Sequence, residues 1–148
     1  MVKNKEVASV LIGEYYHNLD EKGRIMVPVK FRSDFAGKVY ITRGLDQCLF
    51  VFGEAEWNEL YTRIKSLKMS DATPVIRFLW NGACETEFDK QGRILIPQNL
   101  REYAGLSKEA VFAGSATRAE IWDKAKWNAY ESELKSDRIA EIMSQIGL

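Results

Sequence analysis

Two pairs of residues with complementary chemistry occur at the same spacing in the sequence. Asp20 is followed four residues later by Arg24, and Asp89 is followed four residues later by Arg93. An arginine guanidinium presents a planar fork of donors that can bind a phosphate or the acceptor edge of guanine. An aspartate at the start of a turn can hold the turn backbone, or the arginine itself, in one geometry. The spacing therefore predicts two matched anion- and base-binding turns, and an exposed ion pair within each turn is the simpler alternative.

The pairs belong to a longer internal repeat. Segment 19–28 (LDEKGRIMVP) matches segment 88–97 (FDKQGRILIP) at a constant offset of 69 residues. Arg32 and Arg101 extend the match at this offset, and further matches follow at an offset of 70. Repeated sequence indicates a repeated structural unit. Because each half is too small to be stable comfortably alone, we expect the halves to pack as one pseudo-twofold β-barrel.

Each arginine must be positioned by a turn. Residues 14–19 have the composition of a half-buried strand, and residues 20–23 have the composition of a tight turn. Residues 24–27 return as a strand, so the sequence predicts a β-hairpin in which strand 24–27 pairs with strand 14–19. Lys22 and Lys90 lie in the two turns as charges suited to phosphate. The second half is expected to contain the same unit.

A proline follows each expected hairpin. Pro28 and Pro97 suit the first turn of a helix, where a missing N–H costs nothing, and Gly105 is expected to end the second of these helices. Two short strands are then expected in each half, at residues 39–42 and 49–52 and at residues 110–113 and 119–122. Strands and helices grouped in this way predict the α+β fold class.

Each half is expected to end in a longer amphipathic helix. Apolar side chains recur with the helical period at positions 57, 60, 61, 64 and 67, and at 127, 130 and 134, continuing after a phase slip at 139, 142 and 146. The polar segment 68–74 is expected to join the halves. The predicted organisation is an N-terminal extension and first strand at 1–12, a first repeat at 13–73 and a second repeat at 74–148.

Composition narrows the classes of function. Of 148 residues 46% are hydrophobic and 28% charged, and 21 Lys and Arg balance 21 Asp and Glu, which argues against non-specific coating of nucleic acid. Residues 20–32 and 89–101 each nevertheless carry a local charge of +2, so positive charge lies in the repeated motifs. No apolar run approaches the ~20 residues that span a bilayer. Cys48 and Cys84 have no metal- or disulfide-type spacing, so we expect a cytoplasmic protein with free thiols and no membrane partner.

An enzyme is the main alternative class. The single histidine, His17, has no nearby serine or cysteine arrangement for nucleophilic catalysis. Glu85, Glu87 and Asp89 alternate along one expected strand and could hold a divalent cation. The first half has no carboxylate equivalent to Glu85 or Glu87, so an exposed acidic strand edge is the simpler account. We therefore predict no enzymatic activity, no cofactor, no metal site and no small-molecule substrate.

The two motifs resemble those of the MraZ family. The resemblance is carried by LDEKGRIMVPVKFR and FDKQGRILIPQNLR and extends from Gly13 to the C-terminal helix. It implies a duplicated barrel of the AbrB/SpoVT swapped-hairpin type with flanking helices. It also implies a DNA-binding transcriptional regulator of the bacterial division and cell-wall gene cluster, including its own operon. Members assemble into rings of many subunits, so a ring such as an octamer is expected, in the cytoplasm and associated with the nucleoid.

Through this resemblance and the charges of the turns, the expected DNA-binding residues are Asp20, Lys22, Arg24, Asp89, Lys90 and Arg93. Several weak motifs that bind together favour closely spaced direct repeats in promoter DNA, which is double-stranded. Arg93 could instead be buried between the halves, and Arg32 and Arg101 are expected to make structural or assembly contacts. The alternative function is an oligomeric structural or protein-interaction module without DNA binding.

Overall fold

The structure is a computed structural model that describes residues 10–35 and 37–148. Of the extension predicted at 1–12, residues 1–9 lie outside the described residues. The strands are β1 (Leu11–Asn18), β2 (Arg24–Met26), β3 (Lys38–Arg43), β4 (Leu49–Gly53), β5 (Cys84–Glu87), β6 (Arg93–Leu95), β7 (Glu109–Ala116) and β8 (Arg118–Asp123). The helices are α1 (Val29–Arg32), α2 (Glu54–Ile64), α3 (Met69–Leu79), α4 (Gln98–Ala104), α5 (Lys124–Ser132), α6 (Ser136–Ser144) and the short 3₁₀ helix η2 (Leu45–Gln47).

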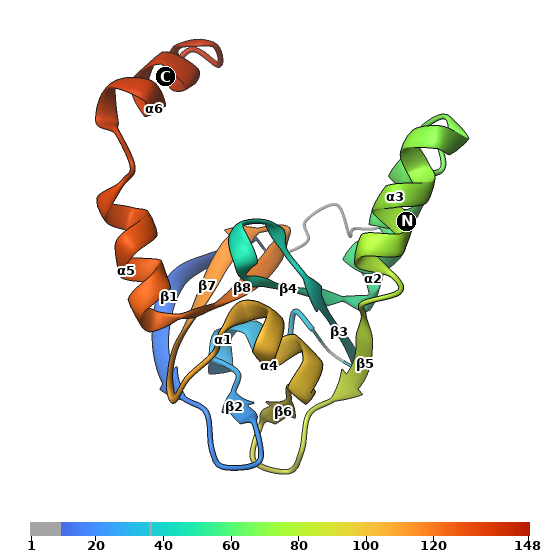
Figure 1. Cartoon of the computed structure of the whole chain (residues 1–148), viewed down its shortest axis with the longest axis vertical. Helices are drawn as coiled ribbons and strands as arrows, with labels where there is room; N and C mark the ends of the chain where they lie inside the picture. Colours follow the sequence, from blue (N-terminus) through green and yellow to red (C-terminus); the bar gives the residue numbers. More distant parts are fainter. Residues whose placement is uncertain (1–9, 36) are drawn as a thin grey trace.

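These elements form a mixed α+β fold, as predicted. Within the described ranges, six strands form an antiparallel sheet in the order β1-β7-β8-β4-β3-β5, and β2 and β6 form a separate two-stranded ribbon. Figure 1 shows the ribbon and helices α1 and α4 on one side of the molecule and the tips of α3 and α6 on the other. The turns that precede β2 and β6 therefore form one end of the molecule.

The strand pairing exchanges elements between the two halves. Strand β1 of the first half pairs with β7 of the second, and β5 of the second half pairs with β3 of the first. The predicted pairing of strand 24–27 with strand 14–19 is therefore wrong, although the turn between them forms and closes with a bond from Asp20 N–H to the Arg24 carbonyl. The reason is burial: Ile25 and Ile94 are almost fully buried when β2 and β6 pair with each other.

The register of the pairs reproduces the internal repeat. Ile25 lies opposite Ile94 at the centre of the ribbon, and Phe50 lies opposite Glu120 in the pairing of β4 with β8. These partners are 69 and 70 residues apart, which are the two offsets of the sequence repeat. Each half thus meets its own equivalent across a pseudo-twofold axis.

Both halves contribute to one core. The Phe31 ring on α1 packs against Phe112 on β7, with ring centroids 5.6 Å apart, and both side chains are buried. Ile25 and Ile94 join the same cluster from the ribbon. A second cluster, formed around Trp57 and other large side chains, lies under the longer helices. Burial of shared apolar surface is what holds the halves together.

The helices follow the sequence pattern with one exception. Pro28 and Pro97 directly precede α1 and α4, and Gly105 ends α4 in the left-handed conformation at φ 61°, as predicted. The predicted phase slip near the C-terminus is a break in the helix between α5 and α6. The four predicted short strands are confirmed as the cores of β3, β4, β7 and β8.

The exception is the joining segment 68–74, for which no helix was predicted and which is helical from Met69. Pro74 lies inside α3 and removes one backbone donor. At the C-terminal end of the helix, Arg43 donates to the carbonyls of Phe78 and Arg77, both at 3.0 Å, and so satisfies acceptors of the last turn.

Candidate nucleic-acid interface

The first turn is organised by the carboxylate of Asp20. Oδ1 accepts the backbone N–H groups of Lys22 at 3.0 Å and Arg24 at 2.9 Å, and Oδ2 accepts Nε of Arg24 at 2.6 Å. Gly23 has a φ of 87°, which L-residues with side chains rarely adopt. One carboxylate therefore fixes both the turn backbone and the guanidinium that follows it.

The second turn has the same geometry. Asp89 Oδ1 accepts the backbone N–H groups of Gln91 and Arg93, both at 2.9 Å, and Oδ2 accepts Nε of Arg93 at 2.8 Å. Gly92 has a φ of 82°. The two aspartate–arginine pairs of the sequence are thus equivalent in three dimensions as well.

One interaction connects the two turns. Nη1 of Arg93 lies 3.6 Å from Oδ2 of Asp20, so Asp20 is paired with an arginine from each half. Among the described ion pairs, Asp89 has only the arginine of its own turn. The side chain of Arg93 remains 24% exposed, against 32% for Arg24, so neither arginine is buried between the halves.

The ribbon presents both arginines on one surface. Arg24 lies opposite Leu95 and Arg93 lies opposite Met26 in the pairing of β2 with β6. Successive residues of a strand point to opposite faces, and Ile25, between Arg24 and Met26, is buried in the core. The arginine-bearing face is therefore the outer face. Figure 1 shows the two turns next to each other at this end of the molecule.

The two lysines expected to contact DNA, Lys22 and Lys90, lie in the turns. Lys22 and Lys90 are exposed, as are the neighbouring Glu21 and Gln91. Because Lys22 and Lys90 occupy different positions in their turns, the two halves present different charge patterns on the same backbone. The interface is therefore symmetric in its arginines and asymmetric in its lysines.

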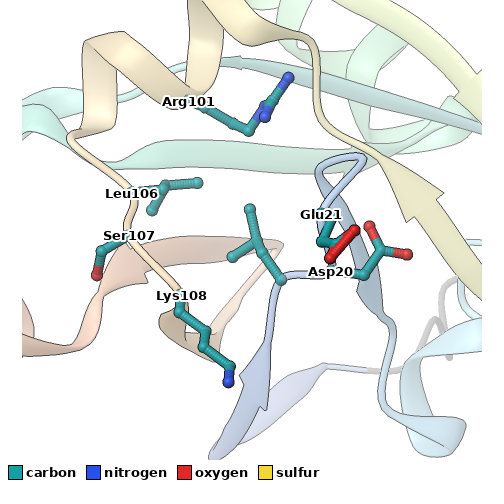
Figure 2. A pocket seen from close by; sticks show the side chains of 7 residues that line it. Asp20, Glu21, Arg101, Leu106, Ser107 and Lys108 are labelled. Carbon is teal, nitrogen blue, oxygen red and sulfur yellow. The ribbon is translucent and has the colours of Figure 1, made fainter.

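Sequence reasoning missed a pocket beside the first turn. Its volume is about 470 Å³, and it is lined by Leu19, Asp20, Glu21, Arg101, Leu106, Ser107 and Lys108. Figure 2 shows the segment after α4 on one side of this pocket and the turn residues Asp20 and Glu21 on the other. Lys108 is brought there by strand exchange, since its carbonyl accepts the N–H of Leu19 at 2.8 Å. No local pattern in the sequence predicts that neighbour.

Both carboxylates of the turns have lowered pKa values. The pKa of Asp20 falls to about 2, mainly because the backbone N–H of Arg24 donates to it, with further contributions from the Arg24 side chain and the Lys22 N–H. The pKa of Asp89 is lowered for the same reasons, led by the backbone N–H of Arg93. Hydrogen bonds to the charged form favour that form, so both aspartates are ionised near neutral pH.

A depressed pKa makes the turns sensitive to acid. In the unfolded chain an aspartate titrates near pH ~3.9, so the stabilisation from Asp20 is complete above that pH and is lost as the pH falls toward about 2. We expect a carboxyl-carbon NMR titration to give a midpoint near 2 for Asp20. Asp20→Asn should remove its share of the acid dependence of the unfolding free energy. An Asp20 midpoint at the unfolded value would contradict the geometry of the turn.

The described part of the chain contains no group of three or more His, Cys, Asp or Glu placed to hold a metal ion. His17 is half-buried, and its pKa is lowered by burial and by the charge of Arg32. Burial raises the pKa of Cys48 and of Cys84, so neither thiol is activated as a nucleophile. None of the helices in the described ranges is long and apolar enough to cross a membrane.

Comparison with known proteins identifies the family of the chain. A family model described as "MraZ protein, putative antitoxin-like" matches residues 10–75 and again residues 79–145. A protein of Clostridium beijerinckii is 49% identical over 142 residues, covering 94% of this chain and 100% of its own length. Proteins of Acetivibrio thermocellus and Halothermothrix orenii are 47% and 48% identical, covering 92% and 94% of this chain and 98% and 100% of their own lengths. All three are named "Transcriptional regulator MraZ".

The repeated family match and the names of the relatives place the chain in the class of transcriptional regulators. The chain belongs to the MraZ family.

Proposed function

We propose that the chain binds DNA sequence-specifically and regulates transcription of the bacterial division and cell-wall gene cluster, including its own operon. It does so as a ring-shaped oligomer, of eight subunits or a similar number, on closely spaced direct repeats. The observation that carries the proposal is the matched pair of exposed arginines on the ribbon, each oriented by its own aspartate.

The donor chemistry of these arginines supports DNA contact. Asp20 takes Nε of Arg24, and the two terminal nitrogens of Arg24 have no hydrogen-bond acceptor among residues 10–35 and 37–148. A guanidinium held at one edge in this way offers its remaining N–H groups to a phosphate or to guanine O6 and N7. Lys22 and Lys90 add exposed charge for backbone phosphates. DNA-binding contacts are therefore proposed for Asp20, Lys22, Arg24, Asp89, Lys90 and Arg93.

The strand exchange supports a finer description of the fold. We propose a barrel of the AbrB/SpoVT swapped-hairpin type, and the pairing of β1 with β7 and of β5 with β3 supports it because strands of one half pair with strands of the other. We assign residues 13–73 to the first repeat and 74–148 to the second, preceded by the extension and first strand at 1–12. Helix α3 crosses this boundary, so the halves are joined by a rigid element rather than a linker.

Exposed apolar surface supports self-association. Helix α6 and the residues after it expose Ile142, Met143, Ile146 and Leu148. A separate apolar groove of about 350 Å³ is lined by Leu45, Phe50, Pro74, Val75, Phe78 and Leu79. Apolar surface of this kind marks protein–protein contact sites. Assembly multiplies the number of turns that meet one DNA molecule, which raises the affinity for repeated sites. We place this assembly in the cytoplasm, at the nucleoid.

The proposal is tested by titrating the protein with DNA from upstream of its own gene. Duplexes with one, two and three copies of the repeat should bind with affinity that rises by more than about tenfold from one copy to several. Binding to the longest duplex should fall steeply as salt is raised from low to physiological concentration, because several phosphate contacts release counterions together. Light scattering on the free protein reports the oligomer independently. Equal affinity for scrambled DNA, or binding that salt does not change, would contradict the proposal.

The same exposed apolar surface of α6 favours the second candidate, a structural or protein-interaction module without DNA binding. The two candidates differ in one result: an oligomer that binds no promoter DNA at any salt concentration supports the second.

A further inference from the structure

Arg101 of the second half lies against the turn of the first half. A Cβ placed on Gly23 would lie 2.7 Å from both Nε and Cζ of Arg101, so the guanidinium packs directly on the turn and would have to shift to admit a side chain there. Nε of Arg101 donates to the carbonyl of Ile96 at 2.9 Å, and the N–H of Ile96 donates to the carbonyl of Gly23 at 2.9 Å. Arg101 therefore fixes the backbone at Ile96, and Ile96 holds the turn of the first half through Gly23.

Arg32 of the first half makes the reciprocal contacts. A Cβ on Gly92 would lie 2.7 Å from Nε of Arg32. Nε of Arg32 donates to the carbonyl of Val27 at 3.0 Å, and the N–H of Val27 donates to the carbonyl of Gly92 at 3.1 Å. The two sets of contacts are equivalent, because Arg32 and Arg101, Val27 and Ile96, and Gly23 and Gly92 are each 69 residues apart. The arrangement is thus part of the pseudo-twofold design of the chain.

These contacts reach the candidate interface in one further step. The N–H of Gly23 donates to the carbonyl of Asp20 at 3.0 Å, and the carboxylate of Asp20 holds the backbone and side chain of Arg24. A change in the position of Gly23 therefore changes the frame in which Arg24 is presented. Gly23 is buried, so a shift of the Arg101 side chain against it should displace the turn backbone.

We propose that Arg101 and Arg32 are positioning residues that act across the halves. Arg101 sets the geometry of the turn that carries Arg24, and Arg32 sets the geometry of the turn that carries Arg93. Neither arginine has to touch DNA to control binding. The inference rests on the proposed DNA-binding role of the turns, and it adds that each DNA-contacting turn depends on the other half of the chain.

Amide hydrogen exchange of the free protein tests the crosswise dependence. In Arg101→Met, which keeps the aliphatic stem and removes the guanidinium, the amides of Gly23 and Arg24 should exchange at least about tenfold faster than in the parent. The amides of Gly92 and Arg93 should be unchanged. Faster exchange in both turns alike, or only in the turn of the second half, would overturn the proposal.

Arg32→Met should give the opposite pattern, with faster amide exchange in turn 89–93 and an unchanged exchange rate in turn 20–24. Arg138→Met is the matched control, because Arg138 lies on α6 and is 69% exposed. It should change neither turn. If a methionine variant fails to fold, the lysine variant at the same position is measured for the same crosswise pattern.

DNA binding separates positioning from direct contact. Arg101→Met should bind promoter DNA at least about tenfold more weakly than the parent, and Arg101→Lys should bind no better, because an ammonium cannot reproduce the flat contact and the Nε bond. Full recovery with lysine would identify Arg101 as a phosphate contact and would overturn the proposal. If the parent itself binds no DNA, the proposed function fails, while hydrogen exchange still decides whether the halves position each other's turns.

Discussion

Replacing Arg24 with alanine is expected to abolish binding to promoter DNA while the fold and assembly remain intact. The side chain is one-third exposed, and within residues 10–35 and 37–148 its side-chain bond is to Asp20, so its removal should leave the core unchanged. One bidentate arginine contact to a base is worth about 1–3 kcal/mol, and an oligomer loses that contact at every subunit that meets a repeat. The combined loss should exceed about a hundredfold in a gel-shift titration.

Arg93→Ala should also weaken binding, for two reasons. It removes the second motif and it removes the 3.6 Å pairing with Asp20, which helps to hold the first motif. Arg138→Ala, a change of the same type at an exposed position on α6, should bind like the parent. Parental affinity in both Arg24→Ala and Arg93→Ala would exclude the turns as the DNA-binding site.

The second large effect is expected in the core. Phe112 is fully buried on β7 of the second half and packs on Phe31 of the first half. Phe112→Ala should lower the free energy of unfolding by about 3–5 kcal/mol, because it removes apolar contacts and leaves a cavity. Chemical denaturation should still show one transition, since both halves share the rest of the core.

The matched control for that experiment is Val29→Ala. Val29 lies on α1 two residues before Phe31 and is 73% exposed, so its truncation should change stability by less than about 0.5 kcal/mol. Two separate transitions in Phe112→Ala would mean that the halves unfold independently, which would contradict the shared core.

The local geometry of the candidate site could be predicted from the sequence. The bonds from Asp20 to Lys22 and Arg24 span at most four residues, so the turn residues and their spacing were sufficient. Gly105 ended its helix as predicted for the same reason, because the left-handed conformation is a property of one residue.

Contacts between distant parts of the chain could not be predicted in this way. Strand β2 pairs with β6 rather than β1 because Ile25 is buried against Ile94, and a repeat in the sequence does not say whether a strand pairs within its own half. The neighbours Arg101 and Gly23, and the approach of Lys108 to the first turn, depend on that same exchange. The helix at 69–79 was not predicted, and the contacts that Arg43 makes to its C-terminal carbonyls come from a distant strand, β3.

The exchange of strands has a consequence for how the chain is made. Tyr15 on β1 has Phe112 on β7 as its partner, 97 residues later, so the first strand cannot complete its sheet until most of the chain has left the ribosome. Folding that depends on contacts so far apart is slow compared with folding from local contacts. The first half of the chain must therefore wait, with apolar side chains such as Ile25 of β2 uncovered, for the second half to be synthesised. A nascent chain interrupted between the repeats would be a target for chaperones or proteases rather than a smaller version of the protein.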